Sequence, residues 1–190
     1  MSRRLSRLGL LAGLLAAACA GSPDHFYTLT PLPEAQGGPP AAPTVHLLLN
    51  VTIPELMDRS EMVLSTSTHG ISILEHERWA LSLSEHVSQT LARDIERRRP
   101  DILVANRGFD HAGTRQVSMT VDIVRMSVQR GGQASLEARW HLVDASAGTD
   151  ELGSAALSEP LGSNDYSAVA QAYSQALSAL ADKLAGSVRR

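Results

Sequence analysis

The feature that most constrains the fold is a pair of long alternating stretches on either side of Gly131-Gly132. Apolar residues before the glycines occupy one phase at Val117, Met119, Val121 and Ile123, and the other phase at Val124, Met126 and Val128. This predicts either a strand buried on both faces or a bulge near Ile123-Val124. Apolar residues alternate again at Ala134, Leu136, Ala138, Trp140 and Leu142. Because two glycines can supply the positive φ angles of a tight turn, the sequence predicts a long β-hairpin here.

Shorter stretches of the same kind predict further strands. Apolar residues alternate over 45–53 before Pro54, and runs at 62–65 and 71–74 flank the polar loop 66–70, which indicates a hairpin. Strand-forming residues also occur at 26–30, 102–105 and 152–157.

Two segments have helical periodicity. The first has apolar residues at Trp79, Leu83, Val87, Leu91 and Ile95, and Pro100 must end it. The second runs from Tyr166 to Leu184 after a cap at Asn164 or Asp165. The resulting order of strands and helices predicts an α+β fold: a mostly antiparallel β-sheet with two amphipathic helices packed on one face.

The N-terminus has the three parts of a secretory signal. Arg3, Arg4 and Arg7 precede an apolar run over 8–18, which ends in small residues before Cys19. A spanning helix needs about 20 apolar residues, so this run is too short to cross a membrane. Cys19 is the only cysteine, and it occupies the place of the modified residue of a bacterial lipobox, although Ala16 stands where Leu is usual. The sequence therefore predicts a lipoprotein signal peptide over 1–18.

Lipidation would attach a diacylglycerol and an N-acyl chain to Cys19, and no other cofactor is expected. The alternative, a free thiol, is disfavoured because an unpaired cysteine in an oxidising compartment invites unwanted pairing. A lipidated tether is expected over 19–25 and a single periplasmic domain over 26–190, with a Pro/Gly-rich loop at 31–43. Phe26 follows Cys19 by seven residues, so the tether reaches roughly 25 Å at most. Ala20 stands where inner-membrane retention signals have Asp, which favours the periplasmic face of the outer membrane.

Composition argues against nucleic-acid binding. Aromatic residues make up only 4 % of the chain. The signal holds three of the 17 basic residues and none of the 20 acidic ones, which leaves a formal charge of −6. The basic run 97–99 has two interpretations, the favourable cationic end of a helix or a lipid-headgroup site, and the first is preferred.

No catalytic or metal site is predicted. The motifs of serine hydrolases, P-loop proteins and zinc proteases are absent, and the seven histidines show no metal-ligand spacing. Glu75-His76-Glu77 and Glu85-His86 could serve acid/base chemistry, but no nucleophile is in register with them. The chain is therefore predicted not to be an enzyme.

Several segments resemble the ABC-type transport auxiliary lipoproteins. The most specific are Leu56-Met57-Asp58-Arg59-Ser60-Glu61-Met62-Val63 and the dipeptide Arg78-Trp79. Phe26-Tyr27-Thr28-Leu29, Trp140 and Asp165-Tyr166 are also similar to the family pattern, whereas Leu81-Ser82-Leu83 departs from it. The similarity covers nearly the whole mature chain.

The resemblance implies a non-catalytic subunit of a system that moves phospholipid between the inner and outer membranes. Its expected partners are a periplasmic MCE-domain protein that forms a ring or tube, the outer-membrane lipids that hold its acyl anchor, and further copies of itself. Asp58, Arg59 and Arg78 are the candidate partner-binding residues. For Asp58 and Arg59 a role in fixing their own loop is preferred, and Arg78 is left undecided.

Two other classes remain open. One is an envelope-assembly lipoprotein, such as a secretin pilot or a cell-wall-associated factor, which would share the anchor but lack the MCE partner. The other is a hydrolase, which would need a pocket that joins His76 or His86 to a nucleophile.

Overall fold

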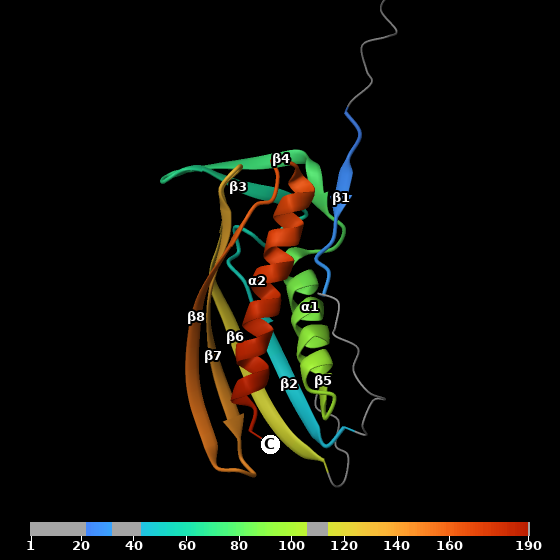
Figure 1. Ribbon diagram of the computed structural model, residues 1–190, viewed down its shortest axis with the longest axis vertical. Helices are drawn as coiled ribbons and strands as arrows, with labels where there is room; N and C mark the ends of the chain where they lie inside the picture. Colours follow the sequence, from blue (N-terminus) through green and yellow to red (C-terminus); the bar gives the residue numbers. More distant parts are fainter. Residues whose placement is uncertain (1–21, 32–42, 106–113, 190) are drawn as a thin grey trace, which may run out of the picture.

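The computed structural model describes residues 22–31, 43–105 and 114–189, which form two β-sheets and two helices (Figure 1). The larger sheet has the strand order β5-β2-β6-β7-β8. Its strands are β2 (Val45–Thr52), β5 (Ile102–Ala105), β6 (Arg115–Val128), β7 (Gln133–Asp144) and β8 (Thr149–Pro160). The pairs β6–β7 and β7–β8 are antiparallel, whereas β2 runs parallel to both β5 and β6.

A smaller sheet of order β1-β4-β3 lies at the end of the molecule from which the N-terminal segment leaves (Figure 1). It contains β1 (His25–Tyr27), β3 (Glu61–Ser67) and β4 (Gly70–Trp79). β3 and β4 form an antiparallel hairpin, and β1 adds to β4 in parallel. The predicted short hairpin is therefore confirmed, with longer strands than the apolar runs alone indicated.

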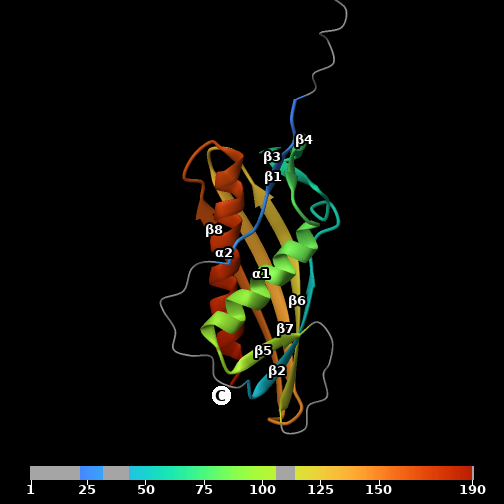
Figure 2. The same cartoon turned by 90° about the vertical axis from the view of Figure 1, so that its right-hand side faces the viewer.

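Both helices cover one face of the larger sheet, as Figure 2 shows. They are α1 (Leu83–Arg98) and α2 (Tyr166–Ser187). Apolar residues at helical spacing place Leu83, Val87, Leu91 and Ile95 in the core, each with no exposed surface. α1 packs against β2 and β5, and α2 packs against β7 and β8. The strand residues on this face are buried because side chains alternate between the two faces of a strand. The predicted α+β fold with two helices on one sheet face is confirmed.

The phase change within 117–128 is resolved as a bulge. The register between β6 and β7 shifts between Ile123 and Arg125. Residues of the first phase up to Ile123 are buried, Val124 is exposed, and Met126 and Val128 are buried again. The extra residue therefore keeps both halves of β6 facing the core. The turn that follows uses Gly131 with φ of 67°, as the paired glycines predicted.

A close contact between β7 and β8 depends on a missing side chain. Gly153 pairs with Trp140 across the two strands. A Cβ atom at position 153 would lie 2.2 Å from the nearest indole carbon of Trp140. The ring therefore lies over the backbone of β8, and any side chain at 153 would displace it.

Trp79 is the residue that sequence periodicity places in the wrong element. It is the last residue of β4, and α1 begins four residues later. The hydroxyl of Ser82 accepts a hydrogen bond from the backbone N–H of Glu85 and marks the N-cap. Trp79 is nevertheless a core anchor, as expected, since its ring is only 3 % exposed and lies 6.4 Å from that of Tyr173.

Predictions for the remaining segments vary in outcome. The strands expected near 45–53, 102–105 and 152–157 are observed, and Asp165 is the N-cap residue of α2, although its side chain makes no capping hydrogen bond. The signal peptide, the first part of the tether and most of the Pro/Gly-rich loop lie outside the described residues. Within the described residues, neither helix has the length and hydropathy needed to cross a bilayer.

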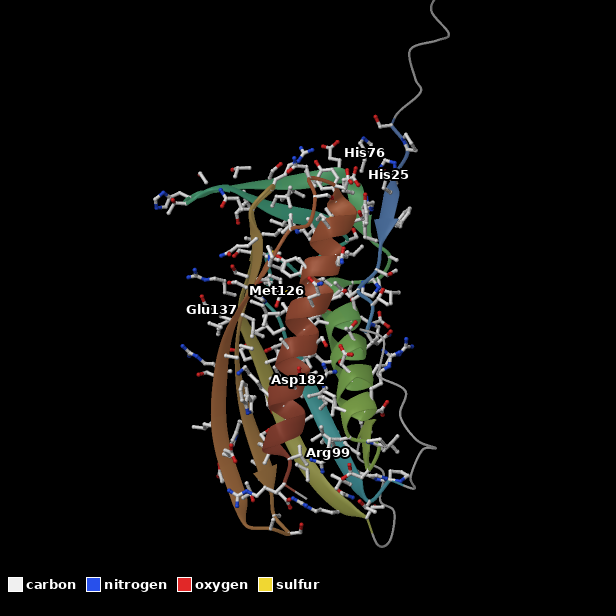
Figure 3. The ribbon with its side chains drawn as sticks, viewed as in Figure 1. His25, His76, Arg99, Met126, Glu137 and Asp182 are labelled. Atoms are coloured by element: carbon white, nitrogen blue, oxygen red, sulfur yellow. The ribbon has the colours of Figure 1, made fainter. Side chains whose placement is uncertain are left out.

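The basic run at the end of α1 joins the two helices. Arg98 donates hydrogen bonds to the hydroxyl and carbonyl oxygens of Ser178 at 2.6 and 3.0 Å and forms an ion pair with Asp182 on α2. Its guanidinium also lies 3.4 Å from the carboxylate of Asp94, one turn earlier on α1 and fully buried. Figure 3 labels Asp182 and Arg99 on neighbouring elements. The guanidinium of Arg98 therefore joins the two helices, which supports the structural interpretation of the basic run over a lipid-headgroup site.

Two further arginines fix the C-terminal end of α2. Arg99 donates to the carbonyl oxygens of Val188 at 2.7 Å and Ala185 at 3.2 Å, and it pairs with Asp101. Arg115 on β6 pairs with the buried carboxylate of Asp144 and donates to the carbonyl of Arg189. Because the last carbonyls of a helix lack partners within it, these cations stabilise the helix end.

We expect Arg98→Ala to lower the free energy of unfolding by about 2 kcal/mol, because it leaves the buried Asp94 carboxylate without its counter-charge. Urea denaturation of the mature chain measures the change. Arg93→Ala removes the same charge from the exposed side of α1 and should change stability by less than about 0.5 kcal/mol. Equal effects of the two substitutions would contradict the assigned role of Arg98.

Candidate functional site

The three candidate partner-binding residues meet where the loop 53–60 crosses the end of β4 and the start of α1; we call this region the loop–helix junction. The loop is a tight turn in which the backbone N–H of Met57 donates to the carbonyl of Pro54 at 2.8 Å. The side chain of Met57 is buried in the core. This anchor holds the next residues against α1.

Asp58 fixes the start of α1. Its carboxylate accepts a hydrogen bond at 3.1 Å from the backbone N–H of Ser84, one of the amides that a helix leaves without an internal partner. Together with Ser82, Asp58 therefore caps the helix from outside. This is the structural role that the sequence favoured for Asp58.

Arg78 braces the strand that follows the loop. Its guanidinium donates to the hydroxyl of Ser60 at 2.8 Å and lies 3.3 Å from the carboxylate of Glu61. The backbone N–H of Trp79 also donates to the carbonyl of Ser60 at 2.6 Å. The pKa of Glu61 is held below its ordinary value, first by its own backbone N–H, then by the Ser60 hydroxyl and by the charge of Arg78. Arg78, whose role the sequence left open, therefore stabilises the junction through its contacts with Ser60 and Glu61.

Arg59 contributes to the junction through its charge, which helps to lower the pKa of Glu61. Its Nε atom is buried and has no hydrogen-bond partner among the described residues. Its backbone N–H donates to the carbonyl of Met57, so the loop fixes its position without using its guanidinium. Two exposed apolar residues, Leu56 and Leu81, flank the junction in the sequence. A partly buried arginine with an unpaired Nε atom beside apolar surface has the composition of a protein contact site.

The N-terminal strand is bound to the same region by side chains that the sequence did not single out together. The hydroxyl of Tyr27 donates to the carboxylate of Glu77 at 2.5 Å, and a ring nitrogen of His25 lies 3.1 Å from that carboxylate. Burial, followed by the hydrogen bond to Glu77 and its negative charge, raises the pKa of Tyr27 to about 12. Asp24 contacts a ring nitrogen of His76 at 2.9 Å. Figure 3 shows His25 and His76 close to each other at this end of the molecule.

The possible acid/base residues are not assembled into a reaction centre. His76 is exposed and contacts Asp24, whereas His86 is buried on α1 with its ring 6.4 Å from that of Trp79. Burial lowers the pKa of His86. The grooves lined by described residues lie between α1 and β5, between 26–31 and α2, and at the C-terminus of α2, and neither histidine lines them. Within the described ranges, no group of three potential metal ligands is found.

Comparison with known families identifies the chain. The sequence profile of the ABC-type transport auxiliary lipoprotein component matches residues 27–185, which contain the whole loop–helix junction. The chain belongs to this family. As a family of lipoproteins that assist transport, it places this auxiliary lipoprotein in the cell envelope, in a system with other components.

Two solved structures share the fold of this auxiliary lipoprotein. One, an uncharacterised protein, has a TM-score of 0.73 at 16 % identity, with 88 % of this chain and 100 % of the other covered. The other, protein XCC0632 from Xanthomonas campestris, has a TM-score of 0.63 at 19 % identity, with coverage of 85 % and 93 %. The comparison with curated proteins gives no match.

We expect Asp58→Ala to destabilise this auxiliary lipoprotein by about 1 kcal/mol, because it removes an acceptor from the first turn of α1. Asp58→Asn keeps a side-chain oxygen in the same place and should recover most of that loss. Thermal unfolding followed by circular dichroism compares the two variants. Equal destabilisation by Asn and Ala would show that the hydrogen bond to Ser84 is not what Asp58 contributes.

Proposed function

We propose that this auxiliary lipoprotein is a non-catalytic subunit of an MCE-type intermembrane phospholipid transport system. In this role it is anchored through acyl chains on Cys19 to the periplasmic face of the outer membrane, where it docks the periplasmic MCE ring or tube. The observation that carries the proposal is the family match, which includes a junction where the buried Nε atom of Arg59 has no hydrogen-bond partner among the described residues.

The geometry of the N-terminus supports a short-range dock. Asp24 contacts His76 of β4, and Cys19 precedes Asp24 by five residues. Five residues span roughly 18 Å at most, so an anchor at Cys19 would hold the domain against its membrane. A domain held in this way cannot cross the periplasm by itself, and the partner must therefore bridge the gap.

Self-association is part of the proposal. The larger sheet ends in β8, which has no strand on its outer side among the described residues. An unpaired edge of 12 residues offers backbone donors and acceptors to another strand. A ring of copies would also suit a ring-shaped partner, because symmetric assemblies match best through a shared axis.

The test is a pull-down of the lipidated protein from detergent-solubilised envelopes, with partners identified by mass spectrometry. We expect an MCE-domain protein to be recovered, and Cys19→Ala to reduce its recovery because the anchor is lost. Recovery of a secretin or of cell-wall machinery instead would move the protein to the envelope-assembly class.

A substitution at the junction sharpens the same experiment. We expect Arg59→Ala to reduce recovery of the partner severalfold while the protein stays folded, since backbone hydrogen bonds of Met57 and Arg59 fix the loop. Arg93→Ala is the matched control, with the same loss of charge on the exposed side of α1. If both variants recover the partner like the wild type, the junction is not the docking site.

Tether length gives an independent prediction. A Gly/Ser insert of about 30 residues after Ala20 should leave folding unchanged, because it lies before the first strand, yet weaken docking by releasing the domain from the membrane. Complementation of a deletion strain, read out as resistance of the outer membrane to detergent, measures the effect. Unchanged barrier function with the long tether would argue against a dock that depends on closeness to the membrane.

A further inference from the structure

The smaller sheet exposes apolar side chains on the face turned away from the core. On β4, Ile71 and Ile73 are 49 % and 42 % exposed, and on β1 Phe26 is 63 % exposed. Leu74, the residue after Ile73, packs against the core, so Ile71 and Ile73 lie on the opposite face of the strand. Nothing else among the described residues covers these three side chains.

This apolar face lies at the end of the molecule where the lipid anchor is expected. Asp24 is in contact with His76, so Cys19 is within roughly 18 Å of that point of β4. Ile73 and Ile71 precede His76 on β4 by three and five residues, which places them about 10 and 17 Å from it along the strand. In Figure 1, β4 runs across the end from which the N-terminal segment leaves. The apolar face is thus within reach of the same bilayer.

The side chains around this face are polar or acidic. The carboxylates of Asp24 and Glu77 are each in contact with a histidine ring, at 2.9 and 3.1 Å, and Glu75 is exposed two residues after Ile73. The tip of the β3–β4 hairpin, at 66–69, consists of hydroxyl side chains and one histidine. These residues form no basic patch, which an anionic surface would require, so zwitterionic phospholipid is the matching bilayer surface.

We propose that the outer face of the β1-β4-β3 sheet is a membrane-contact surface, on which Phe26, Ile71 and Ile73 enter the headgroup region of the bilayer that holds the anchor. The proposal rests on the proposed lipidation of Cys19, which supplies the local attachment. Contact by these side chains fixes the orientation of the domain, so that its long axis points away from the membrane. The lipid chains alone would leave that orientation undetermined.

The single cysteine allows a direct test. Cys19→Ala gives a cysteine-free mature chain, into which Ile73→Cys introduces one site for a nitrobenzoxadiazole probe. An N-terminal hexahistidine tag in place of the lipid holds the protein on phosphatidylethanolamine/phosphatidylcholine vesicles that contain a nickel-chelating lipid. Leu152→Cys is the matched control, because Leu152 on β8 is an even more exposed apolar residue, at 78 %, on the other sheet.

We expect the probe at 73 to shift to the blue and to be quenched by nitroxide-labelled phospholipid once the protein is on vesicles, while the probe at 152 stays unchanged. Quenching at 73 no stronger than at 152 would overturn the proposal. So would a probe at 73 that is already shielded in solution without vesicles, since a second copy of the chain would then cover this face.

A second measurement uses the native residues. A single acyl chain coupled to the thiol of Cys19 gives only marginal membrane binding, so side-chain contacts become visible in vesicle partitioning. Joint replacement by Ile71→Ser and Ile73→Ser should reduce partitioning about tenfold, whereas Leu152→Ser should not. Equal partitioning of the two folded variants would contradict the contact.

The vesicle assay and the proposed function can fail separately. The hexahistidine attachment requires neither processing of Cys19 nor an MCE partner, so a failed pull-down leaves the membrane-contact test intact. A negative vesicle result, in turn, leaves docking by the junction standing. Mass spectrometry of the mature protein decides independently whether Cys19 carries acyl chains.

Discussion

Burial of a single face of the five-stranded sheet is the constraint on which the rest of the structure depends. Both helices lie on that face, and the inward residues of β6 and β7 are almost wholly buried beneath them. The two helices must therefore pack beside each other, and Arg98 joins them through Ser178 and Asp182. The same arrangement leaves the opposite sheet face exposed, and the smaller sheet lies across one end of the assembly (Figure 1).

Periodicity predicted most of the elements because each has one buried face. The change of phase at residues 123–124 left two alternatives, a strand buried on both faces or a bulge, and the register shift between Ile123 and Arg125 selects the bulge. The parallel pairing of β2 with β5 and β6 could not be foreseen, because alternation gives the face of a strand but not its neighbours. Trp79 was placed in α1 because a four-residue step to Leu83 fits a helix, although the cap at Ser82 begins it later.

The candidate site was predictable as a segment but not residue by residue. The family resemblance indicates Asp58, Arg59 and Arg78 together. The sequence alone does not show which of these side chains form hydrogen bonds within the domain. Contacts separate them: Asp58 accepts from Ser84, Arg78 donates to Ser60, and the buried Nε atom of Arg59 has no hydrogen-bond partner within the described chain. Glu77 was considered only for acid/base chemistry, because its partners His25 and Tyr27 are about 50 residues away in the sequence.

The attachment of β1 also explains how a very short strand can transmit the position of an anchor. Three residues of parallel pairing give few backbone hydrogen bonds, too few to hold a terminal strand alone. The side-chain contacts of His25 and Tyr27 with Glu77, and of Asp24 with His76, supplement them. In the proposed arrangement, β1 connects a lipid on Cys19 to a partner on the loop–helix junction. The strand is joined to that junction directly, since the backbone N–H of Ala80 donates to the carbonyl of Tyr27 just before α1 begins. The smaller sheet and the junction are therefore joined through β1 and β4 into one unit, which is what the proposed function requires: with Cys19 lipidated as we propose, this unit would hold the junction at a fixed height above the membrane.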